Sequence, residues 1–245
     1  MSEVVFIGTS DAFGAGGRRQ SAILLRGEPG TVLLDCGVTT NTGLAALGIE
    51  RDEIDAVLIS HFHGDHFGGL PLFLLAAQYE DQRKRPLEIT GPPEIEARVH
   101  ALAVAMGHPL DLHAFPFPLH FRETHPGAVH SVGPMEIRSF ETRHQIETHP
   151  HGFDVRCGSH RVVYSGDTGW FDELPGHCAG ADLFICECTY RASDFDFHLN
   201  FDLLCEQKRQ FDCGGIILTH LGSQMAERAP NGEFDFADDG LVVRL

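Results

Sequence analysis

A short segment of the chain, SHFHGDHFGG at residues 60–69, holds three histidines and one aspartate within six consecutive positions. Imidazole and carboxylate side chains are the ligands that Zn²⁺ and similar divalent ions take from proteins. His61 and His63 can face one ion, and Asp65 and His66 can face a second. A site with three protein ligands keeps one position open for water, as catalytic metal sites do. The segment therefore predicts metal-dependent catalysis.

A pair of divalent ions about 3.5–4 Å apart can hold a hydroxide and clamp a phosphoryl or acyl oxygen. The two oxygens of one carboxylate can bridge such a pair, and Asp167 in the segment SGDTG is the candidate. Gly166 and Gly169 flank it and allow the backbone to turn sharply towards the ions.

The candidate ligands come directly after predicted strands. Strand ends from different parts of one sheet system converge on the same edge, so residues far apart in sequence can meet there. The strands and the ligands that follow them are Val57–Ile59 with His61, Arg161–Ser165 with Asp167, and Ile216–Leu218 with His220.

Short apolar runs alternate with segments of helical periodicity along the whole chain. Strands and helices, followed by strands and helices again, predict an α/β fold of two β-sheets with helices outside, built as two similar halves within one domain at residues 1–245. Further strands are predicted at Val4–Ile7, Ala22–Leu25, Val32–Leu34, Leu119–Glu123, Met135–Thr142, Phe153–Arg156, Leu183–Ile185 and Leu241–Leu245, and helices at Phe67–Tyr79, Pro93–Met106 and Phe201–Phe211.

Charge and cysteine content limit the partners and the compartment. The 245 residues include 35 acidic and 18 basic side chains, a formal net charge of −17, whereas tight nucleic-acid binding needs a basic face. Seven cysteines without a Cys-x-x-Cys pair suit a reduced, cytoplasmic setting. The N-terminal MSEVVFIGTS lacks the features of a signal peptide, and no apolar stretch approaches the roughly 20 residues of a membrane span. We expect a cytoplasmic protein without a membrane partner.

Several motifs resemble those of one superfamily. HFHGDH matches the H-x-H-x-D-H signature of the metallo-β-lactamase superfamily, and SGDTG and LTHLG match its later motifs in the right order. The opening FIGTSDAFGAGGRRQSAILL, the segment VLLDCG, and CECTY followed by His198 resemble the ribonuclease Z-like branch. The resemblance implies a four-layer αβ/βα sandwich, two mixed β-sheets flanked by helices, with a dinuclear metal site at the top of the sheets.

The resemblance also implies a ligand set and catalytic roles. Asp65 is implied to handle protons, His198 to contact the scissile phosphate or the leaving group, and Glu187 to orient His198. His144 is the expected third-motif ligand, with His149 or His151 as alternatives. The implied ligands are His61, His63 and His144 for the first metal, Asp65, His66 and His220 for the second, and Asp167 between them.

One departure from the branch bears on the substrate. Ribonuclease Z enzymes carry a long basic arm, rich in glycine and proline, that grips tRNA, and the segment from Phe153 to Gly166 has no room for it. We therefore expect phosphodiester chemistry on a small substrate, a cyclic nucleotide or a short nucleotide product, attacked by metal-bound hydroxide. Enzymes of this branch are often dimers, so a homodimer is possible; no tRNA-type partner is expected.

Other reactions use the same ligands. Metal-bound hydroxide can also attack a carboxylic ester, a thioester or a lactone. An iron-dependent oxidoreductase of the same fold is a further alternative, against which the retained Asp65 and His66 count, and a non-catalytic binding protein is a fourth. Zn²⁺ is the ion expected first, in two copies, with Mn or Fe as alternatives.

Overall fold

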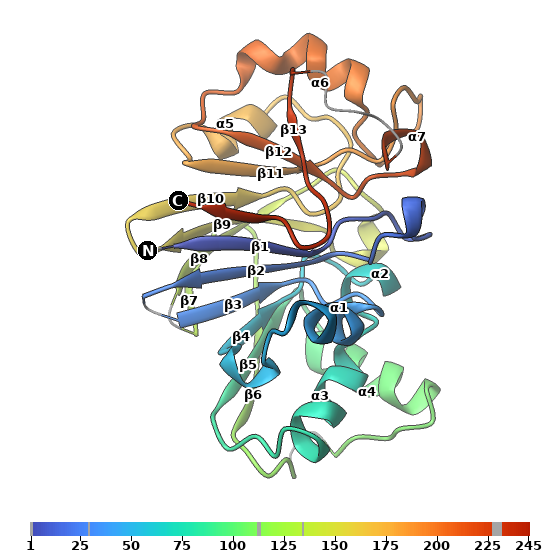
Figure 1. Cartoon of the computed structure of the whole chain (residues 1–245), viewed down its shortest axis with the longest axis vertical. Coiled ribbons are helices and arrows are strands. Elements are labelled where there is room, and N and C mark those ends of the chain that lie inside the picture. Colours follow the sequence, from blue (N-terminus) through green and yellow to red (C-terminus); the bar gives the residue numbers. More distant parts are fainter. Residues whose placement is uncertain (1, 29, 112–113, 134, 227–231) are drawn as a thin grey trace.

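The computed structural model describes residues 2–28, 30–111, 114–133, 135–226 and 232–245. Within these ranges the strands form two seven-stranded sheets, in the orders β14-β1-β2-β3-β4-β5-β6 and β13-β12-β11-β10-β9-β8-β7. Figure 1 shows the two sheets face to face, with helices on their outer sides. Both sheets are mixed, since parallel pairs such as β3 with β4 and β10 with β11 lie beside antiparallel pairs such as β1 with β2.

The helices and strands have the following bounds. The first sheet contains β1 (Glu3–Gly8), β2 (Ala22–Gly27), β3 (Gly30–Leu34), β4 (Ala56–Leu58), β5 (Leu87–Gly91), β6 (Leu119–Glu123) and β14 (Val242–Arg244). The second contains β7 (Val129–Val132), β8 (Met135–Glu141), β9 (His151–Cys157), β10 (His160–Tyr164), β11 (Leu183–Glu187), β12 (Ile216–Thr219) and β13 (Asp235–Phe236). The helices are α1 (Thr40–Leu47), α2 (Gly64–Phe67), α3 (Leu70–Tyr79), α4 (Ile95–Ala105), α5 (Leu174–Cys178), α6 (Phe201–Gln207) and α7 (Ser223–Ala226).

Three apolar clusters hold the layers together. The central cluster lies between the sheets and includes Phe6, Phe153 and Ile185, all fully buried. A second cluster packs α1, α3 and α4 against the first sheet, and a third packs α5 and α6 against the second. Alternate residues of one strand face different clusters, because successive side chains of a strand point to opposite faces. The result is the four-layer sandwich that the sequence motifs imply, so the predicted fold class is confirmed.

Several predicted elements have different bounds. The helix predicted at Phe67–Tyr79 is α3, which begins at Leu70; Phe67 instead ends the short helix α2, and Gly68 and Gly69 lie between the two. A Cβ on Gly69 would lie 2.2 Å from the carbonyl oxygen of Gly37, a close approach that only glycine permits. The helix predicted at Phe201–Phe211 ends as an α-helix at Gln207. The sequence interpretation did not identify α1 or β5.

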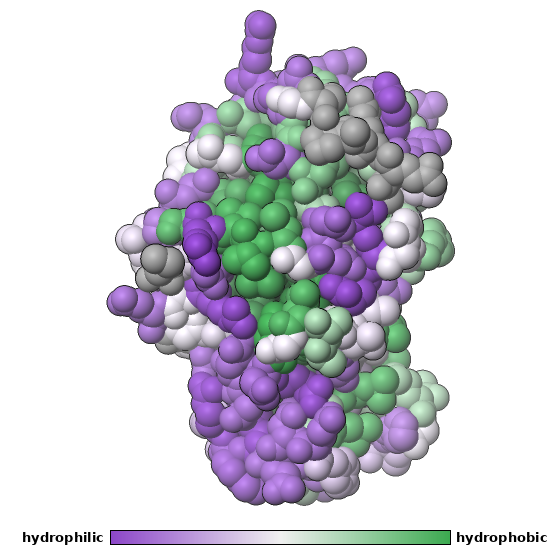
Figure 2. Space-filling model, in the orientation of Figure 1, coloured by the Kyte–Doolittle hydropathy of each residue, from purple (hydrophilic) through white to green (hydrophobic). Residues whose placement is uncertain are grey.

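The surface is uneven in polarity. Figure 2 shows apolar residues gathered in the middle of the face viewed, where edges of the two sheets lie next to each other in Figure 1, and hydrophilic residues over its lower end. Val242 in the edge strand β14 is an apolar residue that is 46% exposed. At another edge, on the right in Figure 1, α2 and α7 lie near the ends of strands from both sheets.

Candidate metal centre

Four connections bring the candidate ligands to one edge of the sandwich. The segment after β4 carries His61 and His63 and continues into α2. The turns after β10 and β12 carry Asp167 and His220, and the turn after β8 carries His144. β4 lies in the first sheet and the other three strands lie in the second, so the ligands meet between the two halves.

We call His61, His63 and His144 the first ligand group. The Nδ1 atom of His63 lies 3.1 Å from Nε2 of His61 and 3.1 Å from Nε2 of His144. Oδ2 of Asp167 lies 3.7 Å from Nε2 of His61 and 4.0 Å from Nε2 of His144. These four side chains can hold one ion together.

We call Asp65, His66 and His220 the second ligand group. Nε2 of His66 lies 3.4 Å from Oδ2 of Asp65 and 3.3 Å from Oδ1 of Asp167. Nε2 of His220 lies 3.2 Å from Oδ2 of Asp65 and 3.5 Å from Oδ2 of Asp167. Asp167 therefore contributes a carboxylate to both groups, as its predicted bridging position requires.

The spacing of these atoms fits divalent cations. Ligand atoms about 2.0–2.2 Å from a tetrahedral Zn²⁺ are separated from one another by roughly 3.3 Å, close to most of the distances above. Nε2 of His66 and Oδ1 of Asp167 are buried and have no hydrogen-bond partner among the described residues. Buried polar atoms without partners are costly, and an ion between them removes that cost. The donor set thus fits the implied metal.

The turn that carries Asp167 depends on glycine. Gly166 has a φ of +57°, and a Cβ there would lie 2.6 Å from the carbonyl oxygen of His151. A Cβ on Gly169 would lie 1.8 Å from the carbonyl oxygen of Asp196. The expectation that these glycines permit a sharp turn agrees with both contacts.

The outer nitrogens of the first ligand group bond to neutral partners. Nδ1 of His61 lies 3.0 Å from the hydroxyl of Ser60, which donates to the carboxylate of Asp35 at 2.8 Å. Nε2 of His63 lies 3.1 Å from the amide oxygen of Gln145. Nδ1 of His144 lies 2.8 Å from the backbone carbonyl of Phe197. Such outer partners fix the tautomer and the ring orientation of a ligand histidine.

Asp35 is a buried carboxylate behind the second ligand group. Its Oδ2 accepts from Nδ1 of His66 at 2.7 Å and from the hydroxyl of Tyr164 at 2.8 Å. The amide and the hydroxyl of Ser60 also donate to it. Asp35 is fully buried and has a φ of +59°, a left-handed conformation that non-glycine residues seldom adopt outside functional sites.

Thr189 bonds to the outer nitrogen of His220. Its Oγ1 lies 2.8 Å from Nδ1 of His220, 3.0 Å from Oε2 of Glu187 and 3.2 Å from Nδ1 of His198. Glu187 Oε1 lies 2.8 Å from Nδ1 of His198. Glu187 is thus in contact with the histidine that it is expected to orient.

The sequence interpretation assigned no role to Asp35, Thr189 or Gln145. Asp35 lies in VLLDCG and Thr189 in CECTY, two segments that carried the resemblance to the ribonuclease Z-like branch. Gln145 directly follows His144 but has no motif of its own. A polar residue at the end of an apolar strand was the available signal for Asp35.

The titration of the histidines differs between the two ligand groups. Burial lowers the pKa of His61 well below its ordinary value and lowers the pKa of His144. Burial also acts to lower the pKa of His66 and His220, but the carboxylates of Asp167 and Asp65 outweigh it and raise both. The second ligand group therefore has the more negative surroundings.

The carboxylates titrate in the complementary direction. Burial acts to raise the pKa of Asp167, yet the neighbouring His220 and His66 hold it well below its ordinary value. Asp65 is shifted down in the same way by His66 and His220. Both carboxylates are therefore ionised at neutral pH and available as ligands.

His198 stands beside both ligand groups. Its ring centroid lies 5.0 Å from that of His144 and 5.4 Å from that of His220, with which it stacks at an angle of 9°. Burial acts to lower the pKa of His198, but the adjacent Glu187 carboxylate outweighs it and raises the pKa to about 9. The imidazole is therefore protonated at neutral pH.

The two alternative third-motif histidines lie elsewhere. His149 and His151 line a different cavity together with Ile146 and Pro150, and neither belongs to a ligand group among the described residues. His151 is nearly buried, and its Nδ1 has no partner within the described parts of the chain. The geometry favours His144, which the sequence interpretation preferred.

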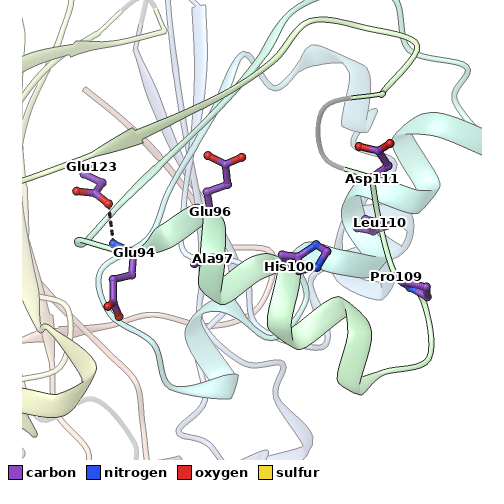
Figure 3. A pocket seen from close by; sticks show the side chains of 8 residues that line it. All are labelled: Glu94, Glu96, Ala97, His100, Pro109, Leu110, Asp111 and Glu123. Carbon is purple, nitrogen blue, oxygen red and sulfur yellow. Dashed lines mark hydrogen bonds between the residues drawn. The ribbon is translucent and has the colours of Figure 1, made fainter.

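A larger cavity of about 750 Å³ lies away from the centre. Figure 3 shows carboxylates of Glu96, Glu123 and Asp111 around it, and Glu123 accepts a hydrogen bond from the backbone amide of Glu94. None of the predicted site residues lines this cavity, so its size does not mark the reaction site.

Comparisons with known proteins agree with the motifs and the fold. Residues 2–243 match the family described as anti-Pycsar protein Apyc1. A protein named ribonuclease Z from Methanothermobacter thermautotrophicus is 27% identical over 305 aligned positions that cover 100% of this chain and 97% of the relative. Another ribonuclease Z, from Mycolicibacterium gilvum, is 28% identical over 90% of this chain and 84% of its own length.

Solved structures show the same fold. The metallo-β-lactamase fold protein YhfI from Bacillus subtilis superposes with a TM-score of 0.79 at 24% identity, covering all of both chains. Human tRNase Z, short form, gives 0.77 at 24% identity over 99% of this chain and 98% of its own. A diphosphatase of the PhnP family gives 0.80 at 16% identity over 100% of this chain and 98% of its own.

The remaining expectations concern compartment and class. None of the seven cysteines, all of which lie in the described ranges, forms a disulfide, and no helix in those ranges has the length and apolarity to span a membrane. The named relatives, the fold and the His/Asp clusters together support a hydrolase that uses divalent metal. The chain belongs to the anti-Pycsar protein Apyc1 family, and it is a metal-dependent hydrolase with the metallo-β-lactamase fold.

Proposed function

We propose that residues 1–245 act as one domain that hydrolyses a small phosphodiester, with a cyclic nucleotide or a short nucleotide product as the substrate class and two Zn²⁺ ions as cofactors. The observation that carries the proposal is the position of His198, which Glu187 holds at Nδ1 and which lies beside both ligand groups. A phosphodiester leaves an alkoxide that needs a proton, and His198 is placed to supply one.

The side chains divide the work as follows. Divalent ions, when bound, lower the pKa of water and offset charge on phosphoryl oxygens. His61, His63 and His144 hold one side of the centre, Asp65, His66 and His220 hold the other, and Asp167 links them. Glu187 occupies Nδ1 of His198, so the proton leaves from Nε2. Asp65, which is 7% exposed, is the carboxylate to which we assign proton handling.

The short β9–β10 connection supports a small substrate. His160 pairs with Cys157, so only Gly158 and Ser159 lie between the two strands. The alignment to the ribonuclease Z of M. thermautotrophicus extends over 305 positions, more than the 245 residues of this chain, so the relative has segments without a counterpart here. The net charge of −17 also opposes a polyanionic partner.

The test is a substrate panel with the purified protein reconstituted with Zn²⁺ and, separately, with Mn²⁺. Bis(p-nitrophenyl) phosphate, 3′,5′-cyclic nucleotides, a tRNA precursor, a lactone and a thioester are compared by kcat/KM. We expect the cyclic nucleotides to be cleaved and the tRNA precursor, lactone and thioester to be turned over at least about 100-fold less efficiently.

Two variants distinguish turnover at this site from turnover by a contaminating enzyme. His63→Ala should abolish cleavage, whereas His120→Ala, at an exposed histidine of β6 remote from the ligands, should not change it. If the lactone or the thioester is the better substrate, the phosphodiester proposal is wrong. Equal activity of His63→Ala and the wild type would also contradict it.

A further inference from the structure

The contacts of Thr189 point to a role that the ligand set alone does not contain. Thr189 follows β11, is 5% exposed, and lies between a candidate metal ligand and the carboxylate that orients the proton donor. Its hydroxyl can accept one hydrogen bond and donate another at the same time. The direction of each hydrogen bond follows from the neighbours.

The ligand role of His220 fixes the first direction. Its Nε2 faces Asp65 and Asp167 within the second ligand group, and an imidazole binds a metal only through an unprotonated nitrogen. The ring proton is therefore on Nδ1. Nδ1–H donates to Thr189 Oγ1 at 2.8 Å, which leaves the threonine hydroxyl proton to be donated elsewhere.

Glu187 accepts the hydrogen bond that this hydroxyl donates. The fully buried carboxylate accepts from the amides of Thr168 and Thr189 and from Nδ1 of His198. Thr189 Oγ1 lies 3.0 Å from its Oε2 and supplies the fourth donor. A carboxylate has about four acceptor sites, so these four donors occupy all the acceptor sites of Glu187. Glu187, although close to His198 and His220, is therefore an orienting group and not a ligand.

We propose that Thr189 is a positioning residue whose hydroxyl connects His220 to Glu187, so that one carboxylate orients both a metal ligand and the proton donor. A carboxylate behind a ligand histidine raises the basicity of the ring and fixes its tautomer. The hydroxyl of Thr189 transmits this effect from Glu187 to His220, because the carboxylate does not itself reach that ring. The proposal rests on the metal-dependent function proposed above.

The same construction recurs in the other half of the molecule. Asp35 bonds directly to His66, and it reaches His61 through the hydroxyl of Ser60. In both halves, one buried carboxylate bonds to one histidine directly and to a second histidine through a hydroxyl. This recurrence makes an incidental contact at Thr189 a poor explanation.

The experiment compares Thr189→Val, which removes the hydroxyl and keeps the shape, with Thr189→Ser, which keeps the hydroxyl. Thr90→Val is the matched control, because Thr90 is also buried and its hydroxyl donates to a carboxylate, that of Glu88, outside the centre. Metal-stripped proteins are titrated with Zn²⁺ in competition with a chromophoric chelator, and kcat and KM are measured separately on bis(p-nitrophenyl) phosphate.

Thr189→Val should bind one of its two ions about 10–100-fold more weakly and lose kcat, with little change in KM. Thr189→Ser should stay within about threefold of the wild type, and Thr90→Val should match the wild type. If Thr189→Val does not fold, Thr189→Cys, of similar size with a weaker donor and acceptor, should show the same loss in smaller degree.

Two results would overturn the proposal. One is wild-type affinity for both ions in Thr189→Val. The other is an equal loss in Thr189→Ser and Thr189→Val, because the methyl group and not the hydroxyl would then matter. Metal affinity is read without any substrate, so a wild type that fails to cleave phosphodiesters refutes the proposed function and leaves this test intact.

Discussion

Asp35 and Glu187 are buried carboxylates at strand ends, one in each half of the molecule, but they bond to histidines with different proposed roles. Both are fully buried at the end of a strand, one after β3 and the other closing β11. Asp35 bonds directly to His66, a candidate ligand, whereas Glu187 bonds directly to His198, which lies outside both ligand groups. In the proposed mechanism, the carboxylate of the first half supports a metal ligand, and that of the second half orients a histidine for proton transfer.

The difference predicts that the two carboxylates fail in different ways when they are neutralised. Loss of Asp35 should act first on metal affinity and stability. Loss of Glu187 should act first on turnover. If both carboxylates only supported metal ligands, neutralising Asp35 and neutralising Glu187 would cause the same defect.

Glu187→Gln has the largest expected effect. His198 loses the charge that raises its pKa to about 9, and kcat should fall about 100-fold or more, as for a disabled general acid. The pKa of His198 falls without the carboxylate, so the protonated form is lost at lower pH, and the alkaline limb of the kcat profile should move to lower pH. Stopped assays from pH 6 to 10 measure this.

A metal titration completes that comparison. Glu187→Gln should keep both ions, with one bound about tenfold more weakly through the Thr189 link. An unchanged alkaline limb with normal kcat would mean that His198 is not the proton donor.

Asp35→Asn should weaken metal affinity by about 10–100-fold. It should also lower the free energy of unfolding by about 3 kcal/mol or more, because donors from Ser60, His66 and Tyr164 lose a buried charged acceptor. Denaturant unfolding of the metal-free protein measures the second effect. Restored kcat at saturating Zn²⁺ is expected; a kcat defect that excess metal does not repair would erase the contrast with Glu187.

Ser60→Ala tests the indirect link of the first half. It removes the hydroxyl between His61 and Asp35 but leaves the direct bond from Asp35 to His66. Affinity for one ion should fall about tenfold, less than in Asp35→Asn. Chelator competition gives the number, and a defect as large as that of Asp35→Asn would show that the direct bond contributes little.

Gln145→Ala has the smallest expected effect. The amide oxygen of Gln145 is a neutral partner of His63, whose side chain is only partly buried, and water can take its place. Metal affinity should fall by less than about tenfold. A loss equal to that of Asp35→Asn would contradict the view that charged outer partners dominate.

Much of the fold was predictable because apolar runs end at residues that stop strands. β4 and β10 were predicted to within one residue, and the ligands follow them closely. β5 was missed: its sequence LEITG is half polar, and its place is set by pairing with β4 and β6. Gly69, just before α3, lies against the backbone of Gly37, a contact that no local pattern contains.

The candidate site was likewise predictable only in part. The spacing in HFHGDH and the turn at SGDTG predicted residues that the fold brings together. The sequence favoured His144, which directly follows a predicted strand, but left His149 and His151 open, because their distance from the ligand groups depends on how the chain turns after β8. Outer partners such as Asp35 and Thr189 depend on contacts across the fold, and a single sequence does not reveal them.

Anomalous diffraction from crystals grown with Zn²⁺, recorded at the zinc edge, tests the central claim most directly. We predict two peaks about 3.5–4 Å apart, one within His61, His63 and His144 and the other within Asp65, His66 and His220, with Asp167 contacting both. A single peak, or peaks outside these two groups, would contradict the account.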